Sequence, residues 1–261
     1  MENQCSFLFF FTIFASCIFN VCLSTEIHLL RPKHGTAGAV PVHGISCDSW
    51  RLGVETNNIR YWKTIPVECE KYVGHYMLGH LYRKDSNIVV YEAIQYAQSI
   101  DLRGSDGKDI WVFDVDETSM SNLPYFAKHG FGAEIFNPAL FYEWVDSAKG
   151  PALPATLMLY RKVISLGFKV VFLTGRTEAH RKGTETNLKR AGYPTWERLI
   201  LRGASDSKLT AIAYKSNKRK KLEEKYGYRI HGNIGDEWSD IIGTNIGNRT
   251  FKLPDPMYYV G

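Results

Sequence analysis

Residues 110–120, IWVFDVDETSM, constrain the fold of this chain most, because two aspartates follow directly on a short apolar run. The apolar run predicts a buried parallel strand, so Asp114 and Asp116 emerge at its carboxyl end, where open α/β sheets build their sites. Two carboxylates this close repel each other unless one holds a proton or a cation neutralises them. Phosphoryl transfer uses both options, with one carboxylate attacking phosphorus, the other protonating the leaving oxygen, and a divalent ion absorbing phosphate charge.

A calcium-binding loop of the EF-hand type is the competing interpretation of the same acidic segment. Such a loop beginning at Asp114 needs glycine at position 119 and glutamate at position 125. The sequence has Ser119 and Tyr125 at these positions, which excludes that loop.

A second apolar run, KVVFL at residues 169–173, leads directly into Thr174, Gly175 and Arg176. The threonine hydroxyl and a backbone amide freed by glycine can bind phosphate oxygens at such a turn. The helix expected from about Glu178 adds its N-terminal dipole. An ordinary strand-to-helix turn explains this segment alone equally well.

A third predicted strand, residues 229–234, ends in a segment rich in acidic residues. Asp236 and Asp240 are four residues apart, so they would share one face of the first turn of a helix. Helix capping explains such acids too. Because acids follow the strands at both Asp114 and Asp236, a shared metal ion with oxygen ligands explains the pattern better.

A lysine for phosphate binding is expected in the segment AYKSNKRKKLEEKYG, whose charges otherwise indicate the solvated face of a helix. Lys215 lies at the start of that helix, from where its side chain can reach the strand ends. Lys208 is the competing candidate.

The order of these motifs resembles that of the haloacid dehalogenase superfamily. D-x-D-x-T begins at Asp114, Thr174 stands in FLTGR, a lysine follows, and GDxxxD spans residues 235–240. Within the superfamily, the chain is similar to the plant acid phosphatase and vegetative storage protein family, itself similar to class B-type acid phosphatases. The resemblance runs from about residue 46 to residue 261, through segments such as CDSWRLGVETNN, FNPALFYEW and FKLPDPMYYVG.

The resemblance implies a haloacid dehalogenase-like fold: an α/β Rossmannoid three-layer sandwich with a mainly parallel sheet, an N-terminal helical extension and a minimal cap. We expect a signal peptide at residues 1–24, an N-terminal arm and helical extension at residues 25–107, and the phosphatase core at residues 108–261. The core and the extension would form one compact domain.

Carried over residue by residue, the resemblance also implies roles at the site. Asp114 would be the nucleophile and Asp116 the general acid and base, while Thr174, Gly175 and Lys215 would hold phosphate. Mg²⁺ would be the cofactor, and the aspartates expected around it are Asp114, Asp116, Asp236 and Asp240.

The expected function is hydrolysis of small phosphate monoesters by an acid phosphatase, through an aspartyl-phosphate intermediate. The alternative is a vegetative storage glycoprotein with little or secondary phosphatase activity. Storage members of the family can carry serine in place of the attacking aspartate, whereas Asp114 is present here. A binding module that keeps a phosphate pocket without turnover is the third class.

Length and charge are compatible with this function. The 261 residues allow one core of α/β size, and an apolar content of 44% is ordinary for a globular protein. The formal charge of +5 is spread along the chain, so it predicts no nucleic-acid partner. The sequence leaves a homodimer open.

The N-terminus is expected to be a targeting segment, because residues 7–23 form an apolar run with small residues near Ser24. Cleavage near Ser24 would send the protein to the secretory pathway, and then to the cell wall or the vacuole, without stable membrane association. The usual basic region is missing before the run, so a signal anchor is the alternative.

Cleavage at that point leaves Cys47 and Cys69 as a pair, which in an exported chain suggests a disulfide contributing about 3 kcal/mol. Two free buried cysteines are the alternative. Asn248 begins a glycosylation sequon, Asn-Arg-Thr, which fits secretion.

Two further regions surround the predicted core. Helical spacing of Val73, Tyr76, Met77, His80 and Leu81 predicts one helix, and residues 89–100 predict a second. The insert at residues 122–154 is strongly aromatic, so it either forms an apolar wall for a leaving group or packs as a small helical core. Its aromatic side chains are Tyr125, Phe126, Phe136, Phe141, Tyr142 and Trp144.

Overall fold

A computed structural model describes residues 44–260 of the chain. Its centre is a sheet of five parallel strands in the order β3-β2-β1-β4-β5. The strands are β1 (Asp109–Phe113), β2 (Lys169–Thr177), β3 (Arg198–Arg202), β4 (Arg229–Gly235) and β5 (Arg249–Lys252). All five residues of β1 are buried, as expected for the central strand of a sheet covered on both faces.

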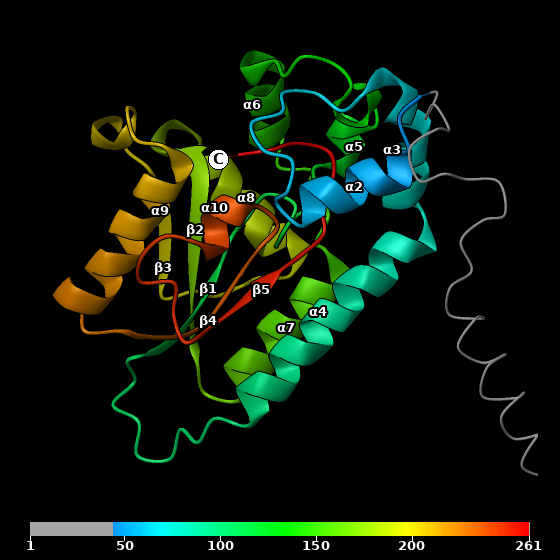
Figure 1. Cartoon of the computed structure of the whole chain (residues 1–261). Helices are drawn as coiled ribbons and strands as arrows, with labels where there is room; N and C mark the ends of the chain where they lie inside the picture. Colours follow the sequence, from blue (N-terminus) through cyan, green and yellow to red (C-terminus); the bar gives the residue numbers. More distant parts are fainter. Residues whose placement is uncertain (1–43, 261) are drawn as a thin grey trace, which may run out of the picture. The chain divides into compact units, whose positions relative to one another are not determined.

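Helices cover both faces of this sheet, which gives three layers (Figure 1). Trp111 and Phe113 of β1 belong to the larger core cluster, with the helices α4 (His80–Gln98) and α7 (Pro154–Ser165). Ile110 and Val112 point to the opposite face, because successive side chains of a strand alternate. There they join the cluster that contains Tyr214 of α9 (Ala211–Lys220). The predicted three-layer α/β class with a mainly parallel sheet is therefore confirmed.

The remaining helices connect the strands or cross their carboxyl ends. α8 (Arg181–Ala191) leads from β2 to β3, and α10 (Trp238–Ile241) follows β4. The insert after β1 contains α5 (Leu123–Phe126) and α6 (Pro138–Asp146) and builds no large cap. The short helical turns are η1 (Val67–Cys69), η2 (Gly130–Gly132), η3 (Glu178–His180), η4 (Ala204–Asp206) and the π-helical η5 (Lys221–Lys225).

The helical extension before the sheet consists of α2 (Cys47–Glu55), α3 (Glu70–Leu78) and α4. The single helix predicted through His80 and Leu81 was wrong, because the chain breaks between α3 and α4 at Gly79. The backbone of Gly79 is extended, with ψ 179°, and a Cβ atom there would lie 2.5 Å from the carbonyl oxygen of His75. Leu81 is consequently exposed at the start of α4.

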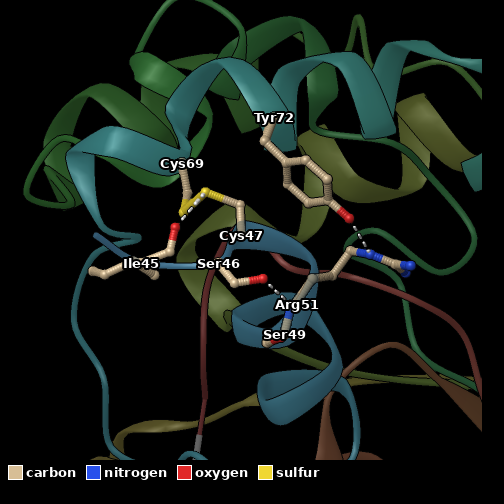
Figure 2. The surroundings of a disulfide bond; sticks show 7 residues. All are labelled: Ile45, Ser46, Cys47, Ser49, Arg51, Cys69 and Tyr72. Atoms are coloured by element: carbon tan, nitrogen blue, oxygen red, sulfur yellow. Dashed lines mark hydrogen bonds between the residues drawn. A yellow bond between two sulfur atoms is a disulfide. The ribbon is translucent and has the colours of Figure 1, made fainter. Parts of the chain in front are cut away.

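A disulfide joins Cys47, the first residue of α2, to Cys69 just before α3 (Figure 2). Beside it, the guanidinium of Arg51 donates to the hydroxyl of Tyr72 at 3.0 Å, so a second contact links the same two helices. The segment that the disulfide closes includes residues 62–64, which line a cleft at the carboxyl ends of the strands. This cross-link therefore fixes both ends of a loop that borders the site.

Residues 45–261 cluster as one compact unit. Among the described residues, no helix has the length and apolar character needed to cross a membrane. The predicted targeting run at residues 7–23 and the cleavage position near Ser24 lie outside the described residues. The boundaries predicted at residues 24 and 107 stay predictions.

Candidate active site

The strand ends bring the predicted site residues to one edge of the sheet. Phe113 of β1 pairs in register with Phe172 of β2 and Ile234 of β4, so the residues that follow these strands emerge at the same level. The backbone N–H of Asp114 still donates to Ile234 at 3.0 Å, which extends the strand pairing by one residue into the site. The chain then turns sharply at Glu117, whose φ of +46° lies in the left-handed region.

Lys215 of α9 reaches into this edge and contacts two carboxylates. Its Nζ atom lies 2.8 Å from Oδ1 of Asp114 and also contacts the carboxylate of Asp240, and all three side chains are buried. Lys208, the alternative that the sequence left open, is exposed and forms no ion pair with any described residue. The structure therefore brings Lys215, and not Lys208, to the strand ends.

The pKa of Asp114 is raised to about 7. Burial is the main cause, because a desolvated carboxyl group favours its neutral form. The negative charges of Asp236 and Asp116 raise it further, while Lys215 acts in the opposite direction. The positive charge of Lys215 therefore does not offset the rise in pKa that burial and the neighbouring carboxylates cause.

Asp114, Asp236 and Asp240 form a buried group whose carboxylate oxygens lie within 4.8 Å of one another. Asp236 is held by two hydroxyl groups: Thr118 donates to its Oδ1 at 2.7 Å, and Tyr258 donates to its Oδ2 at 2.9 Å. Burial also raises the pKa of Asp236. Hard oxygen ligands and an excess of buried negative charge fit a divalent ion such as Mg²⁺.

The carboxylate of Asp116 lies outside that group and faces Arg176. The guanidinium donates from Nε at 3.0 Å and from Nη2 at 2.7 Å, and Asn122 donates to Oδ1 at 2.8 Å. Although burial alone would raise the pKa of Asp116, Arg176 and Asn122 more than offset it and leave the pKa below its usual value. The motif order assigned Arg176 no role, although this residue directly follows Thr174 and Gly175.

A second set of hydrogen bonds fixes Asn122, which the sequence also missed. The indole Nε1 of Trp144 donates to Oδ1 of Asn122 at 3.0 Å, which leaves the amide nitrogen to face Asp116. The backbone N–H of Asn122 donates to Glu117 at 2.8 Å, and Ser121 donates to the same buried carboxyl. Side chains from the insert therefore orient Asp116.

Thr174 and Gly175 stand where β2 meets this edge. The hydroxyl of Thr174 accepts from the backbone N–H of Arg176 at 3.1 Å and approaches Asp116 at 3.4 Å. Gly175 is exposed, and a Cβ atom built there would meet nothing within 4 Å. The space beside this backbone is open to a ligand, while the predicted phosphate contacts of both residues stay predictions.

The tail at residues 254–260 crosses the same edge, which the sequence did not predict. The backbone N–H of Val260 donates to Glu237 at 2.9 Å, in addition to the bond from Tyr258 to Asp236. Asp255 places a carboxylate oxygen within 4.8 Å of those of Asp236 and Glu237. The tail therefore adds an acidic group and two hydrogen-bond donors to the site.

A cleft of about 1010 Å³ opens above the strand ends. Its polar lining comes from the strand ends, α9 and the β2 turn, and includes Asp114, Asp116, Arg176 and Lys215. Its apolar lining comes from the insert, the loop closed by the disulfide and the tail, and includes Tyr125, Phe126, Phe136, Phe141, Tyr142, Trp62, Tyr258 and Tyr259. Tyr125 and Phe126 are buried and also pack on Phe141. Aromatic residues of the insert therefore both pack and line the cleft.

Comparison with known proteins identifies relatives of this chain. The profile of the family described as HAD superfamily, subfamily IIIB (Acid phosphatase) matches residues 33–261. Acid phosphatase 1 of Solanum lycopersicum is 51% identical over 216 residues, which cover 83% of this chain and 84% of the relative. Vegetative storage protein 1 of Arabidopsis thaliana is 40% identical over 243 residues, which cover 92% and 87%.

The fold also has a solved counterpart. The class C acid phosphatase from Bacillus anthracis superposes with a TM-score of 0.61 at 19% identity, over 74% of this chain and 86% of that one. This likeness concerns the fold alone. The family resemblance and the haloacid dehalogenase-like fold predicted from the motif order are both confirmed.

Proposed function

Because this chain belongs to the acid phosphatases of HAD superfamily subfamily IIIB, we propose that it hydrolyses phosphate monoesters through a phosphorylated Asp114, with Mg²⁺ as cofactor. One observation carries the proposal: Asp114 is a buried carboxylate at a strand end, 2.8 Å from Lys215 and facing an open cleft. A nucleophile, a fixed cation and room for an ester are thereby available at one point.

In the first step, a carboxylate oxygen of Asp114 attacks phosphorus while the bond between phosphorus and the ester oxygen breaks. Lys215 would balance charge on the phosphate oxygens, and the hydroxyl of Thr174 and the open backbone at Gly175 would bind them. Asp116 would give its proton to the departing oxygen, which leaves as an alcohol.

The resting state of Asp116 needs a change before it can act as an acid, because its ion pair with Arg176 favours the charged form. A bound phosphate dianion brings negative charge next to Asp116, and like charge raises the pKa of a carboxyl group. It also competes for the guanidinium of Arg176. Both effects favour the protonated Asp116 that the step requires.

In the second step, water attacks phosphorus and transfers a proton to the carboxylate of Asp116. The bond between phosphorus and Asp114 breaks, which releases phosphate and restores the carboxylate of Asp114. Asp116 thus ends the cycle protonated, ready to lose its proton or to serve the next ester.

The carboxylates of Asp114 and Asp236 would hold the ion, and Asp240, which contacts Lys215, lies beside them. Held there, Mg²⁺ would neutralise these carboxylates and withdraw charge from phosphate oxygens. Asp116 was also expected among the metal residues, but its side chain faces Arg176, so its carboxylate is a weaker candidate.

The test is an assay of the purified protein on 4-nitrophenyl phosphate, with and without a chelator. We expect turnover that EDTA abolishes and Mg²⁺ restores, and we expect Asp114→Asn to remove nearly all of it. Full turnover after exhaustive chelation would reject the metal, and retained turnover in Asp114→Asn would reject the nucleophile.

A storage role is the second candidate, favoured by the 40% identity to Vegetative storage protein 1. The presence of Asp114 and its pairing with Lys215 favour the enzyme, because a store of amino acids has no need of a buried, paired nucleophile. A purified protein that folds and binds phosphate but turns over no ester would favour storage or simple binding instead.

We also propose that the protein passes through the secretory pathway, to the cell wall or the vacuole. The disulfide between Cys47 and Cys69 fits an oxidising compartment, and Asn248 of the sequon is exposed. Glycosidase treatment of the protein from its natural tissue would increase its electrophoretic mobility if Asn248 carries a glycan.

A further inference from the structure

We propose that Tyr258 is a positioning residue that fixes the carboxylate of Asp236 for divalent-ion binding, so that the tail is part of the metal site. This inference rests on the proposed function, since it assumes that Asp236 binds the ion. It concerns a side chain 22 residues beyond Asp236 in the sequence, which reaches the carboxylate only through the fold.

The geometry at Asp236 carries the proposal. Thr118 donates to Oδ1 at 2.7 Å and Tyr258 donates to Oδ2 at 2.9 Å, so each oxygen has one hydroxyl partner. A carboxylate oxygen can accept a hydrogen bond and still offer a lone pair to a cation. With both oxygens held, the carboxylate cannot rotate freely, which is how residues around a metal ligand preserve affinity.

Tyr258 is itself held in place by the insert. Its ring stacks on Phe126 of α5, with ring centroids 5.2 Å apart and an interplanar angle of 24°. The preceding residue, Met257, approaches the backbone of Gly132 so closely that a Cβ atom on this glycine would collide with the Met257 carbonyl. Gly132 has a φ of +98°, which also favours glycine. The tail is therefore packed against a segment that belongs to the cleft wall.

The tail has a second anchor beyond Tyr258. The backbone N–H of Val260 donates to Glu237 at 2.9 Å, and the backbone N–H of Met257 donates to Asp255 at 2.8 Å. The first bond ties the backbone after Tyr258 to Glu237, and the second holds the turn that precedes Tyr258. Preorganised contacts of this kind lose little entropy when an ion binds.

Tyr259 provides a matched control in the same tail. Its ring packs edge-on against Tyr61 at 6.0 Å and lies near Trp62, and its hydroxyl makes no hydrogen bond with the described part of the chain. Tyr258→Phe and Tyr259→Phe each remove one hydroxyl oxygen and keep the ring. Only the first of them removes a contact to Asp236.

The experiment measures Mn²⁺ binding to the full protein by titration, with free Mn²⁺ followed by electron paramagnetic resonance. Thermal unfolding of each variant is recorded without metal. We expect Tyr258→Phe to raise the Kd for Mn²⁺ about tenfold, with Tyr259→Phe unchanged and both variants folded. In assays, Tyr258→Phe should need more Mg²⁺ for half-maximal rate, while its kcat at saturating Mg²⁺ stays near that of the wild type.

Equal Mn²⁺ affinities of the wild type and Tyr258→Phe would overturn the proposal, and so would an equal loss in Tyr259→Phe. A wild-type protein that binds no Mn²⁺ would overturn the metal assignment on which the proposal rests, which is a distinguishable result. If Tyr258→Phe fails to fold, Phe126→Leu tests the same idea by removing the ring beneath Tyr258. Unchanged affinity in a folded Phe126→Leu would then overturn it.

Discussion

Replacing Lys215 by methionine removes the cation that contacts Asp114 and Asp240 while keeping a side chain of similar length. The ammonium lies 2.8 Å from Asp114 in a site where both side chains are only 7% exposed. Removing one partner of a buried ion pair costs about 3–5 kcal/mol of unfolding free energy, because the remaining charge is uncompensated. Losing a preorganised donor to a developing charge costs about 10²–10³-fold in rate.

The stability loss should depend on pH. The pKa of Asp114 in the folded protein, about 7, lies above its ordinary value of 3.8, and loss of Lys215 raises it further. The folded state then binds a proton that the unfolded state has released, so stability falls as pH rises through this window. The penalty of Lys215→Met should therefore be largest at about pH 8 and smaller at about pH 5, where protonation of Asp114 removes its charge.

The assay compares Lys215→Met with Lys208→Met, a matched change at an exposed lysine. We expect Lys208→Met to keep its rate within about twofold and its unfolding free energy within about 0.5 kcal/mol of the wild type. Urea denaturation at the two pH values and turnover of 4-nitrophenyl phosphate supply the measurements. An equal loss in both variants, or full activity of Lys215→Met, would refute the reasoning.

Three further outcomes follow from the site and its surroundings. Asp116→Asn should slow alkyl phosphates more than 4-nitrophenyl phosphate, whose departing oxygen scarcely needs a proton; equal losses in kcat would remove the acid role. Replacing Cys47 and Cys69 together by serine should lower the unfolding free energy by about 3 kcal/mol, given a separation of 22 residues, and an unchanged urea midpoint would contradict this. In protein stripped of metal, the raised pKa values of Asp114 and Asp236 should make the melting temperature fall from about pH 5 to pH 8. Added Mg²⁺ should raise the melting temperature more at the higher pH. A melting temperature that rises from about pH 5 to pH 8 would show that these carboxyls ionise freely.

The strand ends could be predicted from the sequence because each is marked by residues that are adjacent in the chain. Each apolar run that became β1, β2 or β4 is followed at once by the polar residues of a motif, and parallel strands place their carboxyl ends at one edge. The register of Phe113 with Phe172 and Ile234 then brings the motifs together. Local pattern and topology were sufficient for this part of the site.

Neighbouring residues in the sequence do not decide whether Lys215 or Lys208 reaches the strand ends. Lys215 lies in α9 while Lys208 precedes that helix, and the packing of α9 against the sheet brings Lys215 to the strand ends. In the structure Lys215 is buried, whereas Lys208 precedes α9 and is exposed. A sequence predicts which face of a helix turns toward the core only where an apolar face stands out. The many charges of this segment obscure such a face.

The support of Asp116 was missed for a related reason. Arg176 lies 60 residues from Asp116 in the sequence. Trp144 acts on Asp116 only through Asn122. A signal for Arg176 was nevertheless present, because it directly follows Gly175 at the end of a predicted strand. Tyr258 had no comparable signal, since its contact with Asp236 depends on the path of the tail across the sheet edge.

Trapping the phosphorylated enzyme tests the central claim most directly. The protein is mixed with a rapidly hydrolysed phosphate monoester and Mg²⁺, quenched in acid and treated with borohydride, which reduces an acyl phosphate to the alcohol. Peptide mass spectrometry should then find homoserine at position 114 in the wild type and no such product in Asp114→Asn. A reduced residue elsewhere, or none while turnover proceeds, would contradict the account of Asp114 as the nucleophile.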